Sequence, residues 1–246
     1  MRGVCQIVRL NWPFYAAAAG LVGVAEVGVV GLRLNAGVRS ALHVASALAC
    51  AWIAASLAVS WVVYDRSRLS RWEWLRETLS FRPRTWLNLH SGFDESTPAV
   101  RRLFAPSTGR VFDIFDPTEM SEPSIARARR LCPPAVRPEP VGFRNLPAAG
   151  ASIDAAFLLL SAHELRTEAA RGSLFAELHR ILAPSGRVIV AEHLRGLANF
   201  AAFGPGCLHF FSRRTWTRTF TRSRFVIDKE FSITPFIRVF VLRRFV

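Results

Sequence analysis

Three of the chain's six histidines lie at or just after the ends of short apolar runs, and two of these have a glutamate beside them. The residues concerned are His90, His163, Glu164, Glu192 and His193. An imidazole beside a carboxylate can take a proton from a hydroxyl group or an acidic carbon. The same groups can instead hold a divalent metal ion that positions a substrate oxygen. These residue types at these places therefore predict a site for acid–base or metal-assisted chemistry.

A single histidine at the end of a strand more often caps that strand and bonds a neighbouring backbone group. Three such histidines favour a shared site, because ligands of open α/β sheets bind beyond the carboxyl ends of the strands. We expect His163, Glu164, Glu192 and His193 to be catalytic, with base chemistry favoured over metal binding. The alternative metal ligands are His90, His163 and His193.

The alternation of apolar runs and helical patterns predicts the elements that position these side chains. A continuous apolar run is typical of a strand that is covered on both faces. The predicted strands are residues 86–90, 110–116, a segment within 136–143, 153–160 and 187–194. The predicted helices are residues 96–104, 121–131 and a segment around 174–182. Residues 224–245 give two alternating runs broken near Thr234, which predicts an antiparallel hairpin. The expected fold class is therefore α/β, a doubly wound, Rossmann-like sheet with this hairpin at its end.

The segment between residues 146 and 194 carries a more specific pattern. It has an "LP…D" start to a strand, a helix that ends in "RILAPSG", and a strand that ends in an acidic residue. The matching residues are Leu146, Pro147, Asp154, Arg180, Leu182, Pro184, Gly186 and Glu192. In this pattern the chain resembles class I S-adenosylmethionine-dependent methyltransferases of the type 11 kind, over residues 86–246. The resemblance implies a Rossmann-like methyltransferase fold, S-adenosylmethionine as cofactor, and a cofactor contact for Leu146.

The first loop of that family usually has an acidic residue followed by three glycines at alternate positions. In "LNLHSGFDES" these positions are held by Asn88, His90, Gly92 and Asp94. Glycine there lets the backbone come close to the cofactor, so two filled positions indicate a rebuilt loop. The resemblance assigns cofactor contacts to His90, Ser91, Gly92 and Asp94.

A carboxylate at the end of the second strand normally binds the ribose hydroxyls, about 20 residues beyond the glycine loop. Asp113 and Asp116 lie 21 and 24 residues after Gly92. Either one alone is as readily a solvated turn residue. We expect one of the two to bind the ribose.

The N-terminal third contains two long apolar segments. Residues 14–32 carry one charge, Glu26, and residues 40–64 carry none. About 20 apolar residues span a bilayer, so we predict a hairpin of two transmembrane helices. A re-entrant hairpin is the alternative, because Glu26 is costly at the bilayer centre. The predicted boundaries are residues 1–66 for the hairpin, 67–84 for an amphipathic basic linker and 85–246 for the methyltransferase-like domain.

The chain is strongly basic, with a formal net charge of +14. Six arginines follow the second apolar segment, whereas the short connection between the segments holds Arg33 and Arg39. The positive-inside rule therefore places both ends, and the catalytic domain, on the cytoplasmic side of a bacterial inner membrane.

Nucleic acid is not an expected partner, because the chain has no ladder of basic and aromatic residues. Four scattered cysteines without CxxC spacing suit a reducing compartment.

These inferences combine into one expected function and two alternatives. We expect a membrane-anchored methyltransferase that acts on a lipophilic small molecule, such as a quinone or a lipid, with the bilayer as partner. The apolar segment 195–216 fits a lid over such a substrate with His209 at its rim, a helix packed on the sheet, or a patch resting on the membrane. The first alternative is a metal-dependent group transferase with a divalent metal at the histidine cluster. The second is a non-catalytic, methyltransferase-like membrane scaffold.

Overall fold

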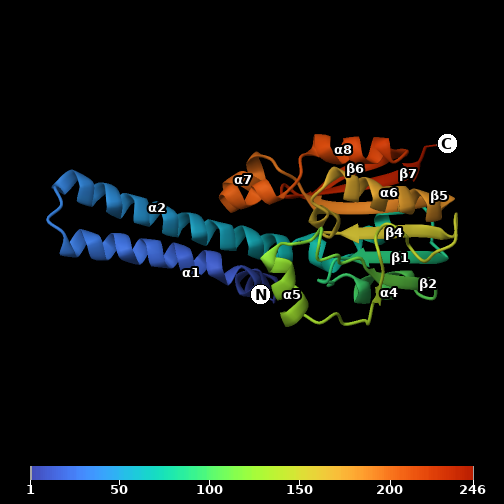
Figure 1. The fold of residues 1–246 in the computed structure, drawn as a ribbon, viewed down its shortest axis with the longest axis horizontal. Helices are drawn as coiled ribbons and strands as arrows, with labels where there is room; N and C mark the ends of the chain where they lie inside the picture. The colour runs from blue at the N-terminus through green and yellow to red at the C-terminus, as the bar shows by residue number, and fades with distance from the viewer. Residues whose placement is uncertain (1, 246) are drawn as a thin grey trace. The chain divides into compact units, whose positions relative to one another are not determined.

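The computed structural model describes residues 2–245, and the chain forms two compact units that divide after Ser67 (Figure 1). The first unit is helical. The second unit contains every strand of the described residues.

Two long helices make up most of the first unit. They are α1 (Arg2–Gly31) and α2 (Ala36–Trp61), and the π-helical turn η1 (Val62–Arg66) follows them. Asn11 departs from helical geometry, with φ −113° and ψ 17°, and marks a kink in α1 just before Pro13. A kink is expected there, because proline lacks the amide that would continue the helical hydrogen bonds.

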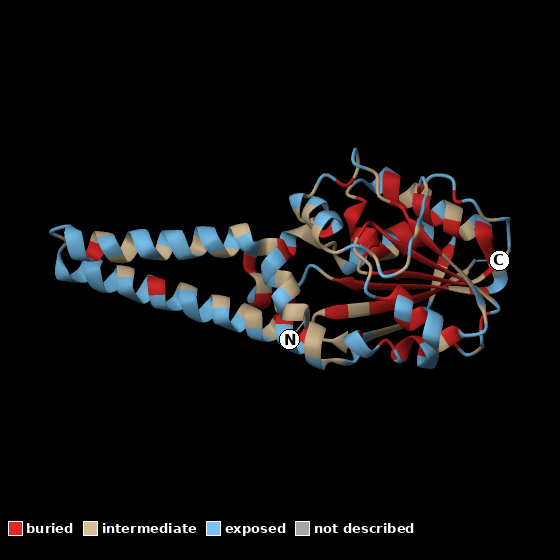
Figure 2. Ribbon diagram, turned by 90° about the horizontal axis from the view of Figure 1, so that it is seen from below, coloured by how far each residue is buried: buried red, intermediate tan, exposed pale blue. Residues whose placement is uncertain are grey.

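Both helices are long and apolar enough to cross a membrane, by length and composition. Most of their surface is exposed (Figure 2). The exposed apolar side chains include Phe14, Leu21, Val24, Val27, Val30 and Leu48. Soluble monomers rarely expose large contiguous apolar patches. The expected pair of apolar helices is therefore present, and their passage through a bilayer stays a prediction.

Polar contacts join the helices of this unit. Asp65 accepts hydrogen bonds from the backbone amides of Gly3, at 3.0 Å, and of the next residue, at 2.9 Å, so it caps the start of α1. Glycine is needed at this position, because an added Cβ would lie 2.6 Å from the Cβ of Tyr64. Nearer the loop between the helices, Glu26 Oε2 lies 2.8 Å from His43 Nδ1. Such a partner lowers the cost of a carboxylate in an apolar segment, which weakens the argument for a re-entrant hairpin.

The second unit is built on one seven-stranded sheet with the strand order β3-β2-β1-β4-β5-β7-β6. The strands are β1 (Thr85–His90), β2 (Thr108–Asp113), β3 (Glu139–Pro140), β4 (Ile153–Leu159), β5 (Leu182–His193), β6 (Phe225–Thr234) and β7 (Ile237–Arg244). Neighbouring strands from β3 to β5 are parallel, and β7 is antiparallel to both β5 and β6. The predicted α/β sheet with an antiparallel C-terminal hairpin is confirmed.

Helices cover both faces of this sheet. After β1, the helices of this unit are α4 (Thr97–Phe104), α5 (Pro123–Leu131), α6 (Glu168–Ile181), α7 (Leu197–Phe203) and α8 (Arg213–Arg222). On one face, Phe104 of α4 stacks on Phe157 of β4, with ring centroids 5.4 Å apart. On the other face, Phe175 of α6 contacts Trp216 and Phe220 of α8 within the main core. The central strands are therefore buried on both sides, which explains their continuous apolar runs.

Three strands have other bounds than the sequence predicted. β2 stops at Asp113, three residues early, because the Asp113 side chain accepts the amide of Phe115 and turns the chain. β3 has only two residues, since the prolines around it cannot donate to a strand ladder. β5 already begins at Leu182 and includes the "APSG" segment, beside a register shift in its pairing with β4.

The segment expected to be a linker, residues 67–84, packs into the second unit. It forms the 3-10 turn η2 (Arg68–Arg71) and the short helix α3 (Trp74–Thr78). Trp74 is 2% exposed, and its ring lies edge-on to that of Phe231 in β6, with centroids 6.3 Å apart. The large apolar side chains of this segment are therefore mostly buried in the second unit and do not form an exposed amphipathic surface.

Candidate functional site

The carboxyl ends of β1, β4 and β5 lie side by side, because these strands are neighbours in the sheet. They bring the predicted histidines to one edge. His90 ends β1, His193 ends β5, and His163 with Glu164 forms part of the turn after β4. Together with Glu192, these side chains belong to residues that are at most 8% exposed. This is the edge at which open α/β sheets bind their ligands.

His163 lies between two carboxylates. It belongs to the turn η3 (Ala162–Glu164), where its Nδ1 is 2.6 Å from Glu192 Oε2 and its Nε2 is 3.3 Å from Glu164 Oε1. The other oxygen of Glu192 accepts the amides of Ala162 at 2.9 Å and His163 at 3.2 Å. Burial lowers the pKa of His163, but the charges of Glu192 and Glu164 outweigh it and raise the pKa to about 10. His163 is therefore an imidazolium at neutral pH, which does not fit the base role predicted for it.

His193 has different partners from Glu192, because consecutive residues of a strand point to opposite faces. Its Nδ1 lies 3.2 Å from Asn199 Oδ1, and its ring stacks on Phe210 with centroids 4.7 Å apart. Burial, followed by the positive charge of His163, lowers the pKa of His193 to about 4. His193 is thus neutral and held in place by packing beside the site.

His209, which was predicted at the rim of a lid, lies in direct contact with His163 and close to Glu164. It ends the 3-10 segment η4 (Gly204–His209), and its ring meets that of His163 edge-on, with centroids 5.2 Å apart. His209 Nε2 is 4.0 Å from Glu164 Oε2, and its Nδ1 is 3.5 Å from Glu122 Oε1. The sequence carries no spacing signal for Glu122, because it precedes α5, far along the chain from the other members.

The other half of the edge is formed by β1 and β2. Asp113 is in register with His90, and Arg129 Nη1 donates to both oxygens of Asp113, at 3.0 and 2.7 Å. Arg129 also lies over the ring of Phe115, 4.2 Å from its centroid. A Cβ added to Gly92, whose φ is +113°, would lie 2.4 Å from Arg129 Cγ. The Arg129 side chain therefore lies between the loop after β1 and the carboxylate at the end of β2. No sequence pattern distinguished it from the many other arginines.

His90 keeps one unused nitrogen in this half. Its Nδ1 accepts the amide of Gly92 at 3.1 Å, and its Nε2 is buried without a hydrogen-bond partner among the described residues. Burial lowers the pKa of His90 by more than the carboxylates of Asp94 and Asp113 raise it. His90 is therefore neutral with its proton on Nε2. Ser91, also predicted at this site, is buried in the same turn.

Side chains close the loop that follows β1. Asp94 Oδ1 accepts the amides of Ser96 and Thr97, both at 3.0 Å, and so caps α4. Asn88 Nδ2 donates to the hydroxyls of the same two residues, at 2.9 and 2.7 Å. Asp94 Oδ2 is left buried without a hydrogen-bond partner within residues 2–245. A network of side chains thus occupies the loop in which the methyltransferase family usually has glycines. In the Asp94 carboxylate, Oδ2 is the oxygen that remains for the cofactor contact predicted for this residue.

Two residues predicted to bind the cofactor lie elsewhere. Asp116 is in the turn after β2, where its Oδ1 accepts the amide and the hydroxyl of Thr118, at 2.9 and 2.6 Å. Leu146 is a core residue whose amide donates to Glu177 at 2.8 Å and whose carbonyl accepts from Arg180 at 2.9 Å. Both partners lie in the last turns of α6, which ends where β5 begins, at the opposite edge of the sheet. This position does not fit a cofactor contact for Leu146.

The alternative metal ligands are also not brought together. Within the described part of the chain, the group whose possible ligand atoms lie within 4.8 Å of one another is His163, Glu164 and His209. His90 is outside it, because its Nδ1 is engaged by its own loop. His193 is outside it, and its Nδ1 lies 3.2 Å from Asn199 Oδ1.

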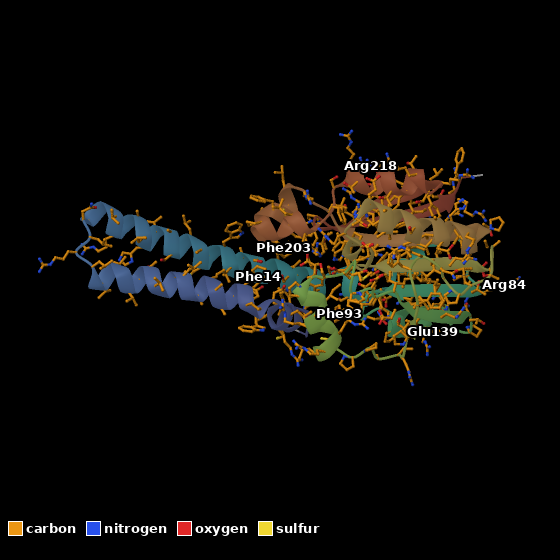
Figure 3. The ribbon with its side chains drawn as sticks, in the orientation of Figure 1. Phe14, Arg84, Phe93, Glu139, Phe203 and Arg218 are labelled. Carbon is orange, nitrogen blue, oxygen red and sulfur yellow. The ribbon has the colours of Figure 1, made fainter. Side chains whose placement is uncertain are left out.

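The apolar segment 195–216 follows β5 and forms α7, η4 and the start of α8. Phe203, labelled in Figure 3, lies edge-on to His193 with ring centroids 5.8 Å apart, next to the stacked Phe210. The segment also exposes large apolar side chains. They are Leu197, Phe200 and Leu208. Part of this segment is therefore packed beside the site, while another part is an exposed apolar surface. Its role as a lid or as a membrane patch stays a prediction.

No protein-family model matches the sequence, and no curated protein matches it at a significant level. The structure is nevertheless similar to solved structures. A SAM-dependent methyltransferase from Aquifex aeolicus has a TM-score of 0.52 at 15% identity, with 70% of this chain and 92% of that chain covered. Geranyl diphosphate C-methyltransferase from Streptomyces coelicolor A3(2), solved with Mg2+, geranyl diphosphate and S-adenosyl-L-homocysteine, has a TM-score of 0.52 at 16% identity, covering 71% and 78%.

Mitomycin 7-O-methyltransferase has a TM-score of 0.53 at 15% identity, with 77% of this chain and 56% of that chain covered. These proteins differ from the chain in most of their residues and agree with it in architecture. The chain therefore has the class I fold of S-adenosylmethionine-dependent methyltransferases.

Proposed function

We propose that this chain is a membrane-anchored, S-adenosylmethionine-dependent methyltransferase that acts on a lipophilic small molecule. One observation carries the proposal. At the carboxyl edge of the sheet, the carboxylate of Asp113 ends β2 in register with the end of β1, beside Gly92 in a left-handed conformation. This is the edge at which the fold binds its nucleotide, with an acidic residue on the ribose.

The residues at this edge fit the cofactor. Asp113 offers a carboxylate for the ribose hydroxyls, and Gly92 offers a backbone without Cβ. His90 offers an Nε2–H that is buried and unpartnered among the described residues, as a group reserved for a ligand would be. Arg129 lies in the way, but its side chain is 34% exposed and can move into solvent.

Bound S-adenosylmethionine supplies a methyl group on a sulfonium centre, which an acceptor atom takes by in-line displacement. The protein then has to align the acceptor and exclude water. We assign the proton of an acceptor hydroxyl to Glu164, whose buried Oε2 has no hydrogen-bond partner among the described residues. His163 positions Glu164 through the contact from its Nε2, at 3.3 Å. Glu192 positions His163 in turn, at 2.6 Å.

Exposed apolar surface supports a lipophilic substrate and a membrane location. Leu197 is 89% exposed, and Phe200 and Leu208 are more than half exposed, in the segment that packs against His193. The two apolar helices of the first unit have the length of membrane spans. The arginines after them favour a cytoplasmic position for the second unit, at a bacterial inner membrane. Two proteins of similar structure carry names that refer to geranyl diphosphate and to mitomycin, both organic small molecules.

Calorimetric titration of S-adenosylmethionine into the full-length, detergent-purified protein tests the cofactor assignment. We expect 1:1 binding that Asp113→Asn weakens by at least about tenfold, or about 1.4 kcal/mol. Asp116→Asn is the matched control, because Asp116 lies in the turn beyond the strand and should leave the affinity unchanged. No binding to either the wild type or Arg129→Ala would contradict the proposal and favour a non-catalytic scaffold.

A further inference from the structure

We propose that His163, Glu164 and His209 form a binding site for one divalent transition-metal ion. Their possible ligand atoms lie within 4.8 Å of one another, and the two segments that supply them are η3, after β4, and η4, after α7. The set differs from the one that strand-end position suggested. It requires no methyl transfer, so it can be tested independently of the proposed function.

The first ligand, His163, is held as metal-binding histidines usually are. Such histidines donate a hydrogen bond from their second ring N–H to a carboxylate or carbonyl, which fixes the orientation of the ring and the tautomer. Here Nδ1 of His163 lies 2.6 Å from Glu192, whose side chain is fully buried and also accepts two backbone amides. Nε2 is thereby directed at Glu164, 3.3 Å away. A bound ion would replace this contact and displace the Nε2 proton to solvent.

The second histidine has a looser form of this arrangement. His209 has its Nδ1 3.5 Å from Glu122 Oε1 and its Nε2 4.0 Å from Glu164 Oε2. The two histidines therefore present their Nε2 atoms to opposite oxygens of one carboxylate, and each has a second carboxylate behind it.

Arg166 ties the two ligand segments together. Its Nη1 donates to the carbonyl of His163 at 3.1 Å and to the carbonyl of His209 at 2.7 Å. Its guanidinium also lies over the ring of Phe211, 4.7 Å from the centroid. Arg166 thus acts as a positioning residue, because it fixes the backbones that carry both imidazoles.

The central carboxylate has a coordination position to spare. Glu164 Oε2 is buried and has no hydrogen-bond partner among the described residues, and such a buried polar atom calls for a ligand. A metal ion on the Glu164 carboxylate would take the place of the proton that the proposed methyl transfer assigns to it. Two ligands of a tetrahedral zinc ion, each about 2.1 Å from the metal, lie about 3.4 Å apart. His163 Nε2 and Glu164 Oε1 lie 3.3 Å apart, which is close to this value. The possible ligand atoms of all three residues lie within 4.8 Å of one another, so a shift of the partly exposed His209 would bring the third ligand into range.

The ligand chemistry identifies the class of ion. Two imidazoles and one carboxylate suit Zn2+, Fe2+ or Co2+, whereas Mg2+ and Ca2+ prefer oxygen ligands alone. Three protein ligands leave further positions open, as in catalytic metal sites. An ion here would lie at the carboxyl edge of the sheet, where a substrate oxygen could bind to it.

Titration of Co2+ into chelator-treated, full-length protein, followed by its visible absorption, tests the site. We expect about one equivalent to bind, with the intense bands of a four- or five-coordinate ion, and Zn2+ to bleach them by competition. His209→Ala and Glu164→Gln should each weaken Co2+ binding by at least tenfold, and Glu122→Gln by about tenfold, because it removes the carboxylate behind His209.

His179→Ala is the matched control, since it removes a histidine of α6 that lies against Phe225 and outside the cluster. Its Co2+ spectrum and affinity should equal those of the wild type. His209 is on a 3-10 segment and partly exposed, so its replacement leaves the fold intact, which circular dichroism verifies. Absence of the Co2+ bands in the wild type, or bands that His209→Ala and Glu164→Gln both leave unchanged, would overturn the proposal.

Discussion

The two halves of the sheet's carboxyl edge satisfy their polar groups in different ways. At the ends of β1 and β2, Arg129 covers Asp113 and Gly92, and Asp94 is drawn into the cap of α4. At the ends of β4 and β5, three carboxylates surround His163 and His209. The first half is closed by a long, partly exposed side chain. The second is held mainly by the buried groups Glu192, His163 and Glu164, and Oε2 of Glu164 has no hydrogen-bond partner among the described residues.

This difference indicates how each half responds to a ligand. The Arg129 side chain is 34% exposed and regains contact with water when it leaves Asp113. The hydroxyl groups of a ligand can then take its place on the buried carboxylate. A buried pair cannot be broken so cheaply, since it leaves an unpaired charge in the interior. We therefore expect ligand binding to rearrange the β1–β2 half and to use the β4–β5 half largely as it stands.

The largest effect should follow from removing Glu192, the fully buried carboxylate of the β4–β5 half. Glu192→Ala leaves His163 Nδ1 and the amides of Ala162 and His163 without their acceptor in a fully buried place. Loss of one partner of a buried pair costs about 3–5 kcal/mol, which corresponds to a decrease of Tm on the order of 10 °C. Thermal unfolding of the detergent-purified protein, followed by circular dichroism, measures it.

The control for this change is an ion pair of the opposite kind. Glu139 binds Arg110 at the end strand β3, with both side chains more than a third exposed. Glu139→Ala should therefore change the stability by at most about 1 kcal/mol. Equal losses of Tm in the two variants would show that the halves of the edge do not differ as described.

A smaller effect is expected when the closed half is opened. Arg129→Ala frees the carboxylate of Asp113 and uncovers Gly92, so S-adenosylmethionine should bind about tenfold more tightly, a gain of about 1.4 kcal/mol. Calorimetry on the full-length protein measures the affinity. Arg130→Ala makes the same change of charge on the exposed neighbouring residue and should have no effect. A weaker affinity for Arg129→Ala would mean that the guanidinium belongs to the cofactor site and does not compete with it.

Much of the second unit could be predicted from the sequence, because its signals are local. The apolar runs that became β1, β4 and β5 have strand length and end at turns, and the histidines at their ends follow from that placement. The tail alternates with a period of two on either side of Thr234, which predicts the hairpin of β6 and β7. In each case, residues close together in the chain carry the information.

The site itself depends on contacts that the chain order hides. Glu192 and His193 are adjacent in sequence, yet only Glu192 reaches His163, because neighbours in a strand face opposite ways. His209 lies 3.5 Å from Glu122, although the strands β3, β4 and β5 and three helices separate the two residues along the chain. The position of Arg129 over Gly92 depends on how α5 is placed against the loop, and a run of arginines in a helix carries no sign of it.

The smallest effect tests whether side chains have replaced the glycines of the loop after β1. Asp94→Ala removes the acceptor for the amides of Ser96 and Thr97 and so the cap of α4, which should cost about 1 kcal/mol of stability. Asp94→Asn keeps an oxygen acceptor and should retain most of that stability, as Asn and Asp cap helices about equally well. Thermal unfolding compares the variants, and calorimetry of S-adenosylmethionine binding separates capping from ligand contact. A loss of affinity in Asp94→Asn without a loss of stability would show that Oδ2 binds the cofactor directly. The β1–β2 half of the edge would then also hold a group that is already in place for its ligand, as the β4–β5 half does.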